Sequence, residues 1–105
     1  MKFIIIDGSL LRNKAVSSDG KLIISYLYNL GKCGKSFFGS YEYMADVLGI
    51  DERKLTHIVR SYLHENLFVQ TPEGLTLGRD LNYFCTFSKA ALDNFKATQS
   101  AAAET

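Results

Sequence analysis

The sequence predicts a single α+β domain built from amphipathic helices and a β-hairpin. Residues 40–66 form two amphipathic helical segments joined by a tight turn at residues 49–51. Beyond them the apolar pattern becomes extended, with turn-forming residues at 72–74. A length of 105 residues with 47% hydrophobic residues suits one domain with its own core. We therefore expect residues 1–99 to form this domain and residues 100–105 to be a disordered tail.

The first third of the chain is expected to hold a strand, a single helical turn and a long helix. Residues 2–6 are β-branched and aromatic, which favours a strand. Residues 9–13 suit one helical turn. A longer helix begins after Ser17 or Ser18, since either hydroxyl can cap it, and it ends in the glycine-containing segment 31–34.

The segment between Ser40 and Gly49 is expected to form the first helix of a helix-turn-helix. Ser40 is a good N-cap, and Gly49 suits the left-handed residue that often ends a helix. Asp51 caps the next helix, and residues 36–39 suit a minor strand before the motif. The residues expected on the buried side of this first helix are Met44, Val47 and Leu48.

The second helix of the motif has one apolar face and one basic face. Residues with the spacing of a buried helical stripe are Leu55, Ile58, Val59, Tyr62 and Leu63. At about 100° per residue, the opposite side carries Arg53, His57, Arg60 and His64. The side chains that flank this second face are Lys54, Thr56 and Ser61. Since Arg, Lys and hydroxyl groups can reach base edges and phosphates, this helix suits the major groove of duplex DNA.

Two further considerations bear on this interpretation. Tyr41 lies at the start of the preceding helix, where its hydroxyl can donate a hydrogen bond to a phosphate. A charged outer face is also what a merely solvated helix presents. The capped partner helix and the turn at Gly49 favour DNA binding over that alternative.

The spacing of apolar residues after the second helix predicts a hairpin, then another strand and a helix. Residues 67–71 and 75–77 are strand-like, and residues 72–74 suit a three-residue loop with Gly74 at its positive-φ position. A hairpin directly after a helix-turn-helix is a wing. Residues 81–87 suit a last strand that pairs with the N-terminal one. Ser88 would cap a final helix whose apolar side carries Ala91, Leu92 and Phe95.

The net charge limits how the chain could bind DNA, and the cysteine content indicates its cellular compartment. The net charge of +1 means that DNA binding must rely on positive charge gathered locally. Cys33 and Cys85 have no C-x-x-C spacing, as expected of reduced thiols in a cytosolic protein. The apolar start is too short for a signal peptide or a membrane span. We expect a protein of the bacterial cytoplasm or nucleoid without a membrane partner.

The sequence has no residue pattern typical of a catalytic site or a metal site. His57 and His64 are seven residues apart, too far for a metal-binding pair of the i, i+4 type, and no acid or cysteine completes a set. Ser61 and the cysteines lack a histidine with a supporting acid at a recognisable spacing, and a Gly-rich phosphate loop is missing. We expect no enzymatic activity, no catalytic residue, no metal, no cofactor and no small-molecule substrate.

Two stretches resemble winged helix DNA-binding domains of plasmid and phage replication initiators and replisome organisers. They are IIDGSLLRNKAVSSDGKLIISYL and SYEYMADVLGIDERKLTHIVRSYLHENLFV. The first looks like a strand and a short Leu-rich turn before a helix start. The second is similar to the pattern Thr-x-x-x-Leu-Ala-x-x-Leu-Gly-(Val/Ile)-(Ser/Asp) followed by periodic apolar residues. The resemblance covers residues 3–78, and small partition and transcription regulators share it.

The resemblance implies a winged helix-turn-helix with a three-helix core, a β-hairpin wing, an N-terminal strand and a C-terminal helix. It implies that the residues facing the groove are Arg53, Lys54, Thr56, His57 and Arg60. It also implies that the wing tip near a phosphate backbone or minor groove comprises Thr71, Glu73 and Gly74.

The function expected from these observations is sequence-specific binding of double-stranded DNA through a recognition helix at about residues 52–66. The binding species would be a homodimer in plasmid or phage replication, partition or transcription control, since one short helix buries little surface alone. Dimerisation would use the N-terminal strand or the final helix. The alternative is a winged-helix protein–protein interaction module without direct DNA binding, which the near-neutral charge favours.

Overall fold

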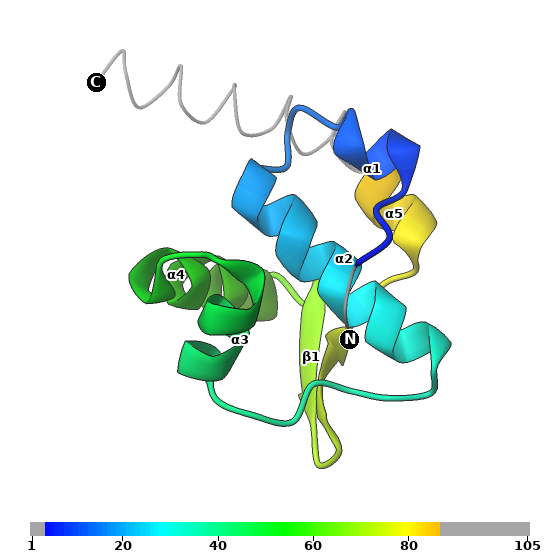
Figure 1. The fold of residues 1–105 in the computed structure, drawn as a ribbon. Coiled ribbons are helices and arrows are strands. Elements are labelled where there is room, and N and C mark those ends of the chain that lie inside the picture. Colours follow the sequence, from blue (N-terminus) through cyan, green and yellow to red (C-terminus); the bar gives the residue numbers. More distant parts are fainter. Residues whose placement is uncertain (1–3, 87–105) are drawn as a thin grey trace, which may run out of the picture.

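The computed structural model describes residues 4–86, which form an α+β fold of five helices and a two-stranded antiparallel hairpin (Figure 1). The elements in chain order are α1 (Gly8–Leu11), α2 (Ser18–Lys32), α3 (Tyr41–Leu48), α4 (Glu52–His64), β1 (Phe68–Thr71), β2 (Gly74–Leu77) and α5 (Leu81–Thr86). The helix at Ser88 and the tail at 100–105 expected from the sequence lie outside the described residues.

The predicted helix caps are confirmed. The hydroxyls of Ser17 and Ser40 and the carboxylate of Asp51 each accept a hydrogen bond from the backbone N–H three residues further on, at 3.0, 3.1 and 3.3 Å. Gly49 ends α3 with a φ of +68°, the left-handed conformation that glycine adopts without strain. The three longest helices therefore begin where their capping residues predict.

The core lies between α2, α4 and the hairpin. Ile23, Ile24 and Leu27 of α2 are buried, and α2 packs against both β2 and α4. Tyr62 of α4 meets Phe68 of β1 edge to face, with ring centroids 5.0 Å apart. Burial raises the pKa of Tyr62, and the charge of Glu65 raises it further. These contacts fix α4 against the hairpin.

The hairpin pairs Phe68 with Leu77 at one end and Thr71 with Gly74 at the other. Its turn therefore has two residues instead of the expected three, and Gly74 belongs to β2 with a φ of +131°. A Cβ on Gly74 would lie 2.3 Å from the carbonyl oxygen of Phe37. Glycine is needed at position 74 because the segment that contains Phe37 packs directly on the backbone of the hairpin at this point.

The expected minor strand at residues 36–39 is reduced to one bridge. Phe37 exchanges two backbone hydrogen bonds with Leu75, at 2.8 and 2.7 Å. The neighbouring Phe38 is 84% exposed. The bridge fixes the start of α3 beside the hairpin.

The expected N-terminal strand is wrong for the residues that can be assessed. Residues 4–7 have no regular secondary structure. The backbone of Ile5 instead binds the side chain of Asn29, with its N–H at 3.4 Å and its carbonyl oxygen at 2.8 Å. A side-chain amide on α2 thus replaces the strand partner.

The expected last strand is also wrong, because Leu81–Thr86 is the helix α5. Asp80 accepts a hydrogen bond from the N–H of Tyr83 at 2.9 Å, which caps the helix. Phe84 is fully buried, and its carbonyl oxygen accepts a 2.6 Å hydrogen bond from the amide of Asn13. Phe84 thus points into the core from a short helix next to α1, whereas Tyr83 is 37% exposed.

The three longest helices, followed by a hairpin that packs on α2 and α4, are compatible with a winged helix. None of the helices within residues 4–86 combines the length and the apolar character needed to cross a membrane.

Candidate nucleic-acid interface

The amphipathic design of α4 is confirmed on its inner side. Leu55 and Val59 are completely buried. The other three residues of the predicted stripe are half-buried, namely Ile58, Tyr62 and Leu63. Since α4 packs on α2, α3 and β1, its opposite face is held outward on a rigid base.

The outer face of α4 carries the predicted site residues. The exposed side chains are Arg53, Lys54, His57, Arg60 and His64, and the half-buried ones are Thr56 and Ser61. Among the described residues, none of the three Arg and Lys side chains is paired with an acid. We call this set the basic ridge. Its charges are free to meet an anionic ligand.

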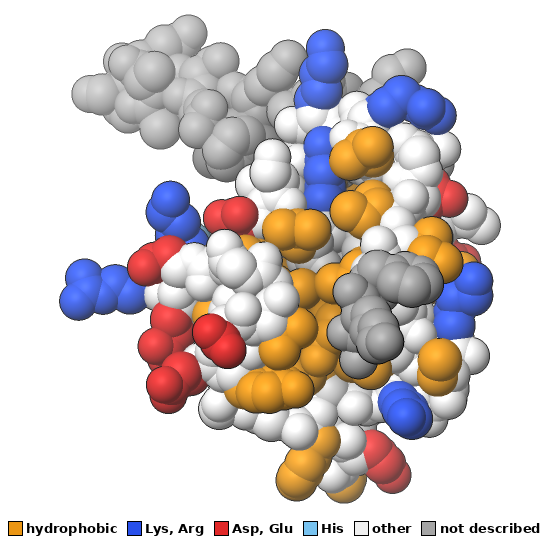
Figure 2. Space-filling view, viewed as in Figure 1, with side chains coloured by type: hydrophobic (Ala, Val, Ile, Leu, Met, Phe, Trp, Pro, Cys, Tyr) orange, Lys and Arg blue, Asp and Glu red, His pale blue; other side chains and the backbone are white. Residues whose placement is uncertain are grey.

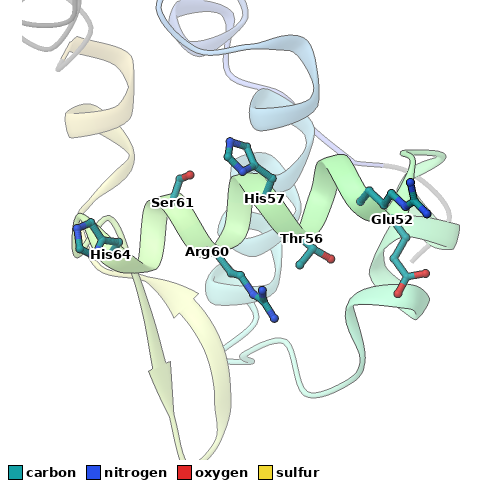
Figure 3. Close-up of a pocket in the computed structure, with 7 residues that line it drawn as sticks. Glu52, Thr56, His57, Arg60, Ser61 and His64 are labelled. Atoms are coloured by element: carbon teal, nitrogen blue, oxygen red, sulfur yellow. The ribbon is translucent and has the colours of Figure 1, made fainter. Parts of the chain in front are cut away.

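A shallow surface hollow runs along the basic ridge, with lining residues Glu52, Arg53, Thr56, His57, Arg60, Ser61 and His64 (Figure 3). Thr56 and Arg60 point to the side on which the hairpin lies. His57 and Ser61 point to the opposite side. The ridge therefore offers two rows of hydrogen-bonding groups along one helix. A ligand that lies across the helix can contact both rows.

Glu52 is the one acid in this hollow, and its part in the site is missing from the sequence prediction. It lies in the first turn of α4, where the positive end of the helix dipole favours a carboxylate. It also precedes Thr56 by four residues, and this spacing on the same face could have revealed it. The arrangement places negative charge at the N-terminal end of the ridge.

Tyr41 is not brought together with the basic ridge. It is half-buried at the start of α3, in a second hollow lined by Phe37, Phe38, Gly39, Tyr41, Gln70 and Leu75. This hollow shares no lining residue with the one along α4. Tyr41 therefore adjoins the hairpin.

Two of the three predicted wing residues hold the hairpin turn. The hydroxyl of Thr71 donates to the carbonyl oxygen of Gly74 at 2.9 Å and accepts from the N–H of Glu73 at 3.2 Å. Gly74 is buried against the Phe37 bridge. Glu73 alone of the three is exposed, so the tip of the hairpin presents an acid.

The cysteines lie apart from the ridge. Cys33 is exposed, and Cys85 is half-buried with its Sγ 3.5 Å from a carboxylate oxygen of Asp7. Burial raises the pKa of the Cys85 thiol, so it stays protonated at neutral pH. Within residues 4–86, no group of three or more His, Cys, Asp or Glu side chains is placed to hold a metal ion.

Comparison with known proteins gives no relative for this chain: no protein-family model, no curated protein and no solved structure matches it.

Proposed function

We propose that the protein binds double-stranded DNA in a sequence-specific manner through α4, as a winged helix-turn-helix. The observation that carries the proposal is the basic ridge, in which exposed cations without an acidic partner among the described residues lie beside half-buried hydroxyls, on a helix whose other side is packed into the core. Duplex DNA fits the basic ridge because its major groove admits an α-helix. The groove also presents pairs of acceptors to which one Arg side chain can donate two hydrogen bonds.

We expect the residues of the basic ridge to contact different parts of the DNA. Arg53 and Arg60 would reach guanine edges or phosphates, and Thr56 and Ser61 would donate to base edges or phosphate oxygens. Lys54, His57 and His64 would add phosphate contacts. Sequence preference would then come from the two arginines and the hydroxyls, while the remaining groups set orientation.

The hairpin and the start of α3, which lie side by side, would contact the DNA backbone next to α4. Tyr41 would donate to a phosphate from its place beside the hairpin. Glu73 at the turn would be repelled by phosphate, so the wing would lie along the backbone without entering a groove. Most of the affinity would therefore depend on α4.

A homodimer would bind more tightly, because one short helix buries little DNA surface. This assembly suits repeated or palindromic half-sites in plasmid or phage replication, partition or transcription control. Such a role would place the protein in the bacterial cytoplasm or nucleoid. Residues 4–7 have no regular secondary structure, which does not favour a two-fold contact through an N-terminal strand.

The test is a salt titration of binding to a random duplex and to duplexes selected from a random pool. We expect the affinity to fall steeply with salt, since each neutralised phosphate releases counterions. Arg60→Ala should weaken binding by roughly tenfold or more and relax the preference at one base pair, with the fold unchanged by circular dichroism. Lys35→Ala, an exposed cation away from the ridge, is the matched control. Parent-like binding by Arg60→Ala and Arg53→Ala, or no DNA retained at low salt, would overturn the proposal.

A protein-interaction module is the second candidate, and exposed apolar side chains favour it. They are Phe38, Tyr43, Val47 and Val69, at 84%, 58%, 42% and 40% exposure. Exposed apolar side chains mark a protein-binding surface where they form a contiguous patch. Binding that is insensitive to salt and to the ridge variants would favour this candidate over DNA.

A further inference from the structure

The outer face of α3 combines apolar and acidic side chains. Tyr43 and Val47, one helical turn apart, are 58% and 42% exposed. Glu42 and Asp46 are exposed beside them, and Glu52 extends the acidic rim at the start of α4. We call these five residues the acidic patch. It would be repelled by DNA phosphate, so a ligand of another kind is needed to explain its apolar centre.

A surface of opposite charge surrounds another exposed apolar residue. Leu11, at the end of α1, is 56% exposed, and the adjacent Arg12 and Lys14 are exposed as well. The ammonium group of Lys21 donates a 2.6 Å hydrogen bond to the carbonyl oxygen of Leu11, which holds a third cation there. We call Leu11, Arg12, Lys14 and Lys21 the basic corner.

Two nearby acids offset part of this positive charge. Asp7 accepts hydrogen bonds from the N–H groups of Ser9 and Leu10 as the cap of α1. Asp19 is half-buried in the first turn of α2. Asp7 is exposed and its charge interacts with that of Arg12, so three cations stand against two acids and the basic corner keeps a net positive charge.

The two surfaces lie at opposite ends of the molecule. Figure 1 shows α1 and α3 on opposite sides of α2. In Figure 2, acidic side chains gather over α3 and α4, and Lys and Arg side chains gather at the other end over the segment that joins α1 to α2. A single chain cannot bring its own two surfaces together, whereas two copies can.

We propose that the acidic patch of one copy binds the basic corner of a second copy, head to tail. The contact removes Tyr43, Val47 and Leu11 from water and places rims of opposite charge against each other. Since the two surfaces differ, the contact is heterologous and leaves one surface free at each end, so further copies can add. It differs from a two-fold dimer and does not depend on DNA.

The size of the surfaces indicates a weak contact. Each contributes four or five side chains, well below the 20–30 residues on each side of a standard stable interface. We expect a dissociation constant on the order of 10⁻⁴ M in dilute solution. The contact becomes important where copies are held side by side, because the effective concentration is then in the millimolar range.

Sedimentation equilibrium of the full chain without DNA tests the proposal. The parent should self-associate at about 50 mM salt and less at about 500 mM, since salt screens the charged rims. The acid-reversed variant Glu42→Lys/Asp46→Lys and the base-reversed variant Arg12→Glu/Lys14→Glu should each associate at least about tenfold more weakly. An equimolar mixture of the two should regain association, because every contact in it again joins opposite charges.

Matched controls separate the contact from general charge effects. Glu65→Lys/Glu73→Lys and Lys32→Glu/Lys35→Glu change the net charge equally at exposed positions outside both surfaces and should associate like the parent. Val47→Ser should weaken association without any charge change, and Val69→Ser should not. These serine variants keep the test open if a charge-reversed variant fails to fold by circular dichroism.

Three results would each overturn the proposal. The first is a parent that stays monomeric up to about 1 mM at low salt, well above the expected dissociation constant. The second is equal weakening by the control pairs. The third is a mixture that associates no better than its separate components. None of these bears on DNA binding by α4, which the ridge variants test independently.

Discussion

The helices α3 and α4 pack on each other with similar inner sides and opposite outer sides. Each is capped at its N-terminus by a side chain and buries two residues completely or nearly so. Outside, α4 presents cations and hydroxyls, and α3 presents acids with apolar side chains between them. Packing constrains only the inner sides, so this division of charge calls for a functional explanation. The two proposed ligands, DNA for α4 and a second copy of the chain for α3, would supply it.

The largest effect should come from the inner side of α4. Leu55→Ala removes a completely buried side chain and should lower the free energy of unfolding by about 2–5 kcal/mol. Arg60→Ala, on the outer side of the same helix, should change it by less than about 0.5 kcal/mol. Urea unfolding of both variants measures the contrast. A comparable loss from Arg60→Ala would mean that the ridge holds the fold together and is not free for a ligand.

The next effect separates the two outer faces by DNA affinity. Arg53→Glu/Arg60→Glu should weaken duplex binding by at least about 100-fold, because two direct contacts become repulsive. Glu42→Lys/Asp46→Lys should change it by less than about tenfold, since those charges act on the duplex only through screened solvent. Fluorescence anisotropy at fixed salt measures both. Similar effects from the two pairs would show that α3 and α4 share one ligand.

A smaller effect concerns the stability that is lost when the N-cap of α3 or of α4 is removed. Ser40→Ala and Asp51→Ala each remove the acceptor of one helix N-terminus and should each cost about 1 kcal/mol of stability. Asp51→Asn keeps an acceptor and should cost less, yet it deletes a negative charge next to the basic ridge. Its DNA affinity should therefore rise modestly. A fall in affinity would show that Asp51 itself contacts the ligand.

How well the sequence predicts these elements depends on how much of the information is local. The caps of α2, α3 and α4 and the turn at Gly49 are encoded by adjacent residues, and the structure confirms them. The apolar period of α4 extends over three turns and predicts its inner and outer sides. Every residue of the ridge is accordingly exposed or half-buried as expected.

Predictions that needed a distant partner did worse. A strand at residues 2–6 and another at 81–87 were each expected to supply the other's hydrogen bonds. In the structure, the side chain of Asn29 binds the backbone of Ile5, and residues 81–86 form a helix whose backbone also binds the side chains of Asp80 and Asn13. Val47 was expected inside, but it lies at the border of the stripe formed by Met44, Ala45 and Leu48 and is 42% exposed. An eight-residue helix gives too few turns to locate such a border.

The smallest effect concerns pH and compares a carboxylate cap with a hydroxyl cap. The backbone N–H groups of Ser9 and Leu10 lower the pKa of Asp7 below its ordinary value of 3.8. The folded state therefore holds Asp7 ionised more firmly than the unfolded state does. The resulting stabilisation is complete above that ordinary value and is lost as the pH falls through the lower, folded-state pKa.

Asp7→Asn keeps an acceptor for α1 but cannot titrate. The gap in Tm between the parent and Asp7→Asn should therefore shrink as the pH is lowered from about 6 to about 3. The gap between the parent and Ser40→Ala should stay constant, since the hydroxyl that caps α3 does not ionise in this range. Thermal melts followed by circular dichroism measure both. A gap for Asp7→Asn that is independent of pH would show that α1 is held by the contact of Leu10 and α5 alone, without help from its cap.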